Sequence, residues 1–390
     1  ELAGTGNDLT GAVSLTGAAV TLNDSTATSI AGITATEALS VTSGGAITQS
    51  GVIDADSTAS FTAGANAITL TDAGNDFSGT VSLSNSGTND VALTDTNALD
   101  LGTVSVGQDL TVTTGGDLTD SGAITVAGLG TIVSTGQNIT LGDSTTANFG
   151  SIDFAGANVS IKEGSAMELA ASEATGTLTL ESSGAVTDSG TLAITGATSI
   201  TATGQDVSLT SPDSSFGDFT VNAKDVYIVE TGSFTSSNIS AEKVEISATD
   251  GVSLVSTGDG LEFAAQSGTG NIEAVNTGGL VISELSNLQG IQFTDADATG
   301  KISLVAKSPL TIDALIDAKG GEVLLVASGA EATDDVTIND NVTGATVYVY
   351  AGDSIAVQGE ATINSSSFEL NVGTNYDVTT ASTSAGSASA

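Results

Sequence analysis

The chain has 390 residues, in which 46 Asp and Glu stand against six Lys, and it contains no Arg, His, Cys or Trp. The net charge of −40 argues against nucleic acid and against an anionic membrane surface as partners, because binding to either depends on Lys and Arg. The absence of Cys excludes disulfides and thiol chemistry, and no apolar run is long enough to predict a membrane-spanning helix.

Short strand signals recur from the first residues onward. Each is a core of one apolar, one polar or small and one apolar residue. Each core starts about 20 residues after the one before it, except at three longer steps of about 30 residues. The cores are VTL (20–22), LSV (39–41), ITL (68–70), VAL (91–93), LTV (110–112), ITL (139–141), VSI (159–161), LTL (178–180), VSL (207–209), VYI (226–228) and VEI (244–246).

A longer repeat is superimposed on these cores. The decapeptide GNDLTGAVSL at 6–15 returns as GNDFSGTVSL at 74–83, and SGGAITQSG at 43–51 has counterparts at 114–122 and 182–190. The resulting superrepeat of about 68–71 residues equals three successive core-to-core steps, and internal periods of this kind indicate a repeat architecture.

A period of about 20 residues without helical spacing predicts an all-β, right-handed parallel β-helix with coils of about 19–23 residues. Alternation places Val20 and Leu22 inward and Thr21 outward. About 18 coils at one strand spacing each would make a rod of about 85 Å. The predicted inward ladder is Val20, Leu39, Ile68, Val91, Leu110 and Ile139.

The chain is expected to fall into three regions. Residues 1–250 are a regular solenoid, residues 251–378 a divergent continuation of it, and residues 379–390 a low-complexity tail. Each of the three longer steps carries an extra short strand signal, at 60–64, 131–136 and 199–204. An added face and a looped excursion are both open interpretations of these signals. The opening ELAGTG is interpreted as the start of a processed product or an excised piece.

Acidic residues follow several strand cores by two positions. Asp72 and Asp95 are expected on adjacent coils, as are Asp143 and Glu163. Stacked carboxylates about 4.8 Å apart repel each other unless they are bridged, and Ca²⁺ is the candidate cation for these four residues. The alternative, and the favoured one, is that an acid suits the turn after a strand.

Two further patterns have structural interpretations. The Asn75, Asp76 and Phe77 turn recurs at 7–9, and it predicts Phe77 in the core and a left-handed backbone at Asn75. A single file of outward Thr and Ser could in principle bind ice, but Ala92 interrupts it, and Thr is simply a good strand former.

Enzyme chemistry finds little support. The chain has no His for a nucleophile triad and no Arg for a lyase. Among its 46 acids, no pair stands out as the two carboxylates of a glycosidase. The sequence therefore predicts a protein that is not an enzyme, with no cofactor beyond the calcium hypothesis.

The segments GNDFSGTVSL (74–83), LTDTNALDLGTVS (93–105) and LTVTTGGDLTDSGAITV (110–126) resemble the repeat arrays of filamentous-haemagglutinin-like exoproteins. The resemblance covers roughly 6–221 and is clearest at 68–141. It implies a right-handed parallel β-helix, export to the bacterial cell surface or matrix, and a role in adhesion, biofilm or fibres. The chain lacks the Asn-Pro motifs of the family's secretion module, which leaves the export route open.

Two functions follow as expectations. In the first, the protein is a secreted structural protein of the cell surface or extracellular matrix that stacks end to end into fibres. In the second, it is an adhesin stalk segment that binds a glycan or a cell-surface receptor. Neither nucleic acid binding nor membrane insertion is expected.

Overall fold

Alternating β-branched and small polar residues dominate the chain, and such residues favour a pleated strand with one buried face. The computed structural model describes residues 1–329 and 333–373, and these contain strands and no α-helix. The strands form two compact units, Glu1–Gly196 and Ala197–Ala390. Each unit is a parallel β-solenoid, which confirms the predicted fold class. The predicted tail at 379–390 lies outside the described residues.

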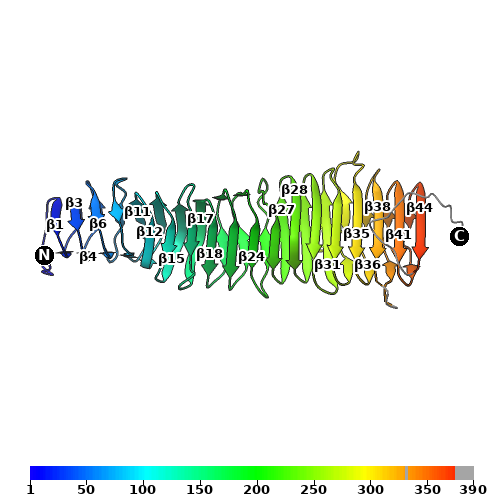
Figure 1. Cartoon of the computed structure of the whole chain (residues 1–390), viewed down its shortest axis with the longest axis horizontal. Helices are drawn as coiled ribbons and strands as arrows, with labels where there is room; N and C mark the ends of the chain where they lie inside the picture. The colour runs from blue at the N-terminus through cyan, green and yellow to red at the C-terminus, as the bar shows by residue number, and fades with distance from the viewer. Residues whose placement is uncertain (330–332, 374–390) are drawn as a thin grey trace. The chain divides into compact units, whose positions relative to one another are not determined.

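The strands of the first unit (Figure 1, blue to green) are β1 (Val13–Gly17), β2 (Val20–Asp24), β3 (Thr28–Ala35), β4 (Leu39–Ser43), β5 (Ile47–Gln49), β6 (Ile53–Ala55), β7 (Ala59–Thr62), β8 (Ile68–Leu70), β9 (Asp76–Phe77), β10 (Val81–Ser84), β11 (Val91–Asp95), β12 (Leu99–Val106), β13 (Leu110–Thr114), β14 (Leu118–Asp120), β15 (Ile124–Val133), β16 (Ile139–Leu141), β17 (Ala147–Gly156), β18 (Val159–Glu163), β19 (Met167–Leu169), β20 (Ser172–Ala174), β21 (Leu178–Ser182), β22 (Val186–Asp188) and β23 (Leu192–Ile194).

The described strands of the second unit (Figure 1, green to red) are β24 (Thr198–Thr201), β25 (Val207–Leu209), β26 (Phe219–Asn222), β27 (Asp225–Glu230), β28 (Ser233–Ser240), β29 (Lys243–Ala248), β30 (Gly251–Ser256), β31 (Leu261–Ser267), β32 (Ile272–Asn276), β33 (Leu280–Ile282), β34 (Ile291–Phe293), β35 (Lys301–Ala306), β36 (Leu310–Ile312), β37 (Ile316–Asp317), β38 (Glu322–Ala327), β39 (Val336–Ile338), β40 (Val342–Thr343), β41 (Thr346–Ala351), β42 (Ile355–Val357), β43 (Ile363–Asn364) and β44 (Ser367–Val372).

A turn of the first unit has three strands. Strands β4, β5 and β6 make one turn, β7, β8 and β9 make the next, and each strand pairs in parallel with its counterpart one turn away. Alternation within the strands is as predicted: Val20 and Leu22 are buried, and Thr21 between them is half-buried. The core is therefore a stack of aliphatic side chains that contact their counterparts in the turns on either side.

The predicted inward ladder is partly wrong. The pairs Val20–Leu39 and Ile68–Val91 are in register, as expected. Leu39, however, pairs with Ala59 rather than with Ile68. The reason is that the same apolar-polar-apolar signal occurs on more than one face of the coil. The longer step from Leu39 to Ile68 therefore combines a full turn, which ends at Ala59, with an advance to the next face.

This geometry also explains the extra strand signals in the longer steps. The signals at 60–64, 131–136 and 199–204 coincide with β7, with the end of β15 and with β24, respectively. Strand β7 continues the ladder of β4 and β10, β15 pairs with β13, and β24 pairs with β26. Each signal is thus an ordinary rung of the solenoid, neither an added face nor a looped excursion.

The second unit keeps the three-strand turn but varies its length. One ladder runs through β30, β32, β35, β38, β41 and β44. On a neighbouring face, Leu261 pairs with Leu280 and Leu280 pairs with Leu310, so the second of these two turns is clearly longer than the first. The longer turn contains a segment, Glu284–Gln289, that leaves the coil.

Candidate functional site

The segment Glu284–Gln289 forms a tight turn on the outside of the second unit. Glu284 and Gln289 make an isolated antiparallel bridge, and the amide of Leu285 donates a hydrogen bond of 2.9 Å to the carbonyl of Leu288. The strand ladders described above are parallel, so this antiparallel turn departs from the repeat. We call this segment the outer turn.

Glu245 of β29 holds the outer turn in place. Its Oε2 accepts hydrogen bonds from the amides of Asn287, at 2.8 Å, and Leu288, at 3.1 Å, and its Oε1 accepts one from Nδ2 of Asn287, at 3.2 Å. Glu245 is only 8% exposed although its side chain points outward from the coil. Such charge-assisted bonds to a carboxylate are stronger than neutral ones, so the position of the outer turn is well fixed.

The floor beside the outer turn is a row of outward side chains on neighbouring strands. Ser208 of β25, Tyr227 of β27 and Glu245 of β29 are in register. The next member of the row is Ala264 of β31, which is fully buried. A small side chain at Ala264 leaves room for the outer turn to lie against the sheet.

A second row of the floor is charged and internally paired. Lys224 lies 3.8 Å from Asp206 and 3.1 Å from Asp225, and Lys243 lies 3.6 Å from Glu262. These ion pairs are exposed and each contributes little to stability. They leave the surroundings of Tyr227 with more carboxylates than ammonium groups.

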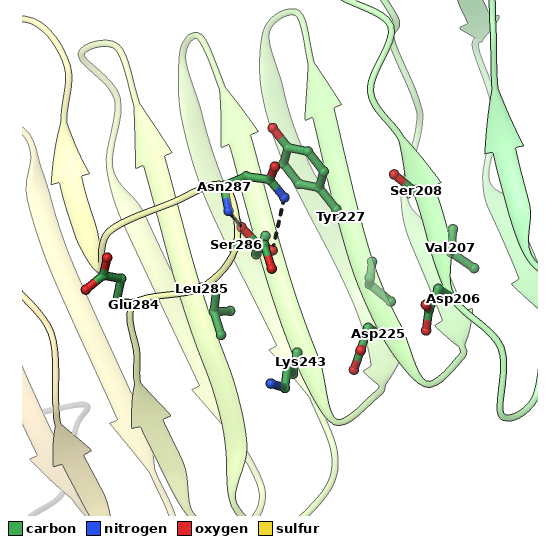
Figure 2. Close-up of a pocket in the computed structure, with 12 residues that line it drawn as sticks. Asp206, Val207, Ser208, Asp225, Tyr227, Lys243, Glu284, Leu285, Ser286 and Asn287 are labelled. Carbon is green, nitrogen blue, oxygen red and sulfur yellow. Dashed lines mark hydrogen bonds between the residues drawn. The ribbon is translucent and has the colours of Figure 1, made fainter.

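The outer turn and the two rows enclose a cleft of about 340 Å³. Figure 2 shows the ring of Tyr227 beside Asn287, with Ser208 on the neighbouring strand and Asp206, Asp225 and Lys243 lower on the same face. Burial and the charge of Glu245 raise the pKa of Tyr227, so the phenol keeps its proton. The cleft therefore combines an aromatic face with several hydrogen-bonding groups, an arrangement suited to binding a small polar molecule.

Two of the four acids predicted as calcium ligands are buried in the first unit. Asp95 is 2% exposed and its Oδ1 accepts the amide hydrogen of Phe77 at 3.0 Å; Glu163 is 1% exposed and its Oε1 accepts that of Phe149 at 2.8 Å. Burial raises the pKa of Asp95 to about 6 and that of Glu163 to about 7. Both acids thus fix the amide of an aromatic residue in a turn.

The other two predicted ligands lie nearer the surface. Asp72 is half-buried and its Oδ1 accepts the amide hydrogen of Gly74 at 2.9 Å, whereas Asp143 is exposed. Register places Leu70 beside Leu93 and Leu141 beside Ile161, so the strands before each predicted pair of acids are adjacent as expected. Within residues 1–329 and 333–373, no group of three or more acids is arranged to hold a metal ion. Calcium binding remains a prediction.

A buried acid recurs once in each superrepeat. Asp24, Asp95, Glu163 and Glu230 occupy equivalent positions of successive copies. Each accepts the amide hydrogen of an apolar residue that lies 14 to 18 positions earlier, respectively Leu9, Phe77, Phe149 and Phe216. We call these four acids the repeat acids.

The repeat acids differ in their second oxygen. Oδ2 of Asp24 lies 3.4 Å from the hydroxyl of Thr28. In the later repeats the position four residues after the acid is apolar, and the second oxygens of Asp95, Glu163 and Glu230 are buried without a hydrogen-bond partner. Burial raises the pKa of Glu230 to about 7 as well. A carboxylate without a partner is costly to bury, which accounts for the raised pKa values.

The Asn75 turn is structural, but not for the predicted reason. Phe77 is fully buried, as expected, and contacts Phe61 edge to face. Asn75 does not have a left-handed backbone, since the non-glycine residues with positive φ in the described chain are Asp213 and Lys319. Its buried side chain instead exchanges hydrogen bonds with Gln49 and binds backbone groups of three further residues, Leu70, Thr94 and Ile53.

The cleft itself was not anticipated from the sequence. Its signals in the sequence are the non-repetitive segment ELSNLQG at 284–290 and a Tyr at an outward strand position in a chain with four Tyr.

The described residues contain no helix that could span a membrane.

Comparison with known families supports the repeat assignment. A family model described as repeats of unknown function (DUF5649) matches residues 17–84, 88–152 and 156–222, just over half of the chain. The matched segments start at 17, 88 and 156, so their spacing equals that of the superrepeat, and they contain the first three repeat acids but not Glu230. No curated protein and no solved structure matches the chain.

Proposed function

We propose that this chain, which belongs to the family of repeats of unknown function (DUF5649), is a structural protein of the bacterial cell surface or extracellular matrix that stacks end to end into fibres. The repetitive β-solenoid is compatible with such a role, and it is a fold typical of structural proteins rather than of enzymes. The resemblance to filamentous-haemagglutinin-like exoproteins supports export and a surface location.

The observation that carries this proposal is the final described coil of the second unit. Phe368, Leu370 and Val372 of β44 are 42%, 40% and 51% exposed. Their partners in β41 are Val347, Val349 and Ala351, which are at most 5% exposed. Within residues 197–329 and 333–373, β44 pairs on one side only. A coil of a second copy would cover these apolar side chains and pair with the open edge.

Charge sets the conditions for this stacking. The final coil carries Asp353, Glu360 and Glu369, and the first residues of the chain carry Glu1 and Asp8 without a lysine. Two such ends repel each other at low ionic strength, and salt screens that repulsion over a Debye length of about 8 Å in physiological salt. Fibres are therefore expected to grow longer as salt increases.

The experiment is negative-stain microscopy of the purified chain over a range of salt concentrations. We expect filaments, and we expect Val372→Glu to abolish them. Val275→Glu is the matched control, because Val275 is 45% exposed on the outside of the same unit. Single particles in all salt conditions, or equal loss of filaments in both variants, would refute end-to-end stacking.

A second candidate function is that of an adhesin segment that binds a glycan. The cleft beside the outer turn favours it, because the cleft is a hollow with an aromatic side chain built by a segment that departs from the repeat. A chain that stays monomeric but binds cells or glycans would support this function over the first.

A further inference from the structure

We propose that the cleft beside the outer turn binds one or two units of a saccharide that carries no negative charge. This inference rests on the second candidate function, that of an adhesin, and it names the site and the class of ligand.

One wall of the cleft is an additional segment of the chain that hydrogen bonds hold in a fixed position. The turn from Leu280 to Leu310 is longer than the turn before it, and its additional residues include the outer turn. Three hydrogen bonds from Asn287 and Leu288 to Glu245 fix the outer turn across two coils. Leu288 is 5% exposed and anchors the outer turn by burial. A preformed wall of this kind reduces the conformational entropy that the protein must lose when a ligand binds.

The floor presents one aromatic ring between polar groups. Tyr227 is half-buried, with the Ser208 hydroxyl on one side and the Glu245 carboxylate on the other. The apolar face of a sugar ring can lie on an aromatic ring while its edge hydroxyls reach the Ser208 hydroxyl; both Glu245 oxygens already accept hydrogen bonds from the outer turn. Figure 2 shows Asn287 next to the Tyr227 ring, where its amide can meet such hydroxyls.

The remaining polar groups select the charge of the ligand. The carboxyl groups of Asp206, Asp225 and Glu284 line the cleft, and carboxylate oxygens accept hydrogen bonds, so they favour a ligand that donates them. Lys243, the cation among the lining residues, lies 3.6 Å from Glu262. An acidic sugar would be repelled, whereas hydroxyl or amine groups would be accepted. The volume of about 340 Å³ is at the small end of ligand sites, which limits recognition to one or two sugar units.

Fluorine NMR of the full chain labelled with 3-fluorotyrosine tests the proposal directly. The chain has four Tyr, and Tyr227→Phe identifies the signal of the cleft. The probes are neutral oligosaccharides of glucose, galactose and mannose, a glucosamine oligomer, and a galacturonic acid oligomer, each at millimolar concentration. We expect a neutral or an amine-bearing probe to shift the Tyr227 signal and to leave the stacked Tyr348 and Tyr350 unshifted.

Two variants distinguish binding in the cleft from nonspecific binding to the acidic surface. Tyr227→Leu should weaken binding about tenfold or more, because it removes the aromatic contact. Tyr348→Leu, the same change on an outward strand position elsewhere in the unit, should have no effect. No shift with any probe, a shift with galacturonate, or a glucosamine effect that Tyr227→Leu leaves intact would overturn the proposal. Filament formation, measured separately, would be unaffected by that result.

Discussion

The raised pKa values of Asp95, Glu163 and Glu230 make the stability of the solenoid depend on pH, and Glu163→Gln isolates the contribution of one of these acids. Burial raises the pKa of Glu163 from 4.5 to about 7 in the folded chain. The folded state therefore holds this proton more tightly than the unfolded state does. The contribution of Glu163 to the free energy of unfolding is therefore largest below about pH 4.5, falls as the pH rises toward about 7, and changes little above that value.

The size of the effect follows from the pKa change. One pKa unit is worth about 1.4 kcal/mol, so Glu163 contributes up to about 3 kcal/mol of unfolding free energy at low pH that is lost at pH 8. In Glu163→Gln this pH dependence disappears. At low pH the variant is less stable than the parent by about 1 to 3 kcal/mol. The reason is that the side-chain NH2 group, which replaces the unpartnered Oε2, has two donors and no hydrogen-bond acceptor. Near pH 8 the two proteins converge.

Urea unfolding followed by circular dichroism at a series of pH values measures this difference. The control is Glu168→Gln, which removes the same charge from an exposed position of the neighbouring strand β19. Charge repulsion within the whole chain affects both variants equally, so only their difference reports on burial. If the two variants follow the same curve, the explanation by burial of Glu163 is wrong.

Three further outcomes are expected. Phe77→Ala removes a fully buried ring and should destabilise the first unit by about 3 to 5 kcal/mol in urea unfolding; a loss below about 1 kcal/mol would contradict its place in the core. The melting temperature should be indifferent to added Ca²⁺ and to a chelator, because two of the four predicted ligands are buried and bonded to backbone amides; a calcium-dependent rise that the chelator reverses would favour calcium bridging. Glu245→Ala should make the outer turn sensitive to limited proteolysis at Asn287, since it removes three hydrogen bonds, whereas Glu262→Ala, at a half-buried position of the neighbouring strand β31, should not; equal cleavage would contradict the role of Glu245.

The fold class was predictable because one physical rule governs most of the chain. Alternating apolar residues at a period of about 20 leave a parallel solenoid as the simplest way to bury most of the Val, Ile and Leu side chains. The ladders were harder to predict, because Leu39 is followed by two equally good candidates, at 59 and 68, and only the geometry of the turn selects Ala59. Local pattern does not determine which face a strand occupies.

The candidate site was predictable only in part. The turn role of Asp95 and Glu163 was one of two interpretations of a regular spacing, and their hydrogen bonds to Phe77 and Phe149 agree with it. Their burial was not foreseen, since an acid two residues after a strand core resembles any surface turn residue. The cleft depends on Glu245 and Asn287, which are distant in sequence and contact each other only because the outer turn folds back over two coils.

The superrepeat does not complete a whole number of turns. Strands β2 and β11 carry equivalent residues of successive copies, yet β2 belongs to the ladder of β4 and β7, and β11 to that of β8 and β13. Duplication of such a unit during evolution would therefore display each new copy in another direction. Equivalent positions of consecutive copies therefore lie on different faces, so a binding strip along one side could not be built from the same repeat position in every consecutive copy.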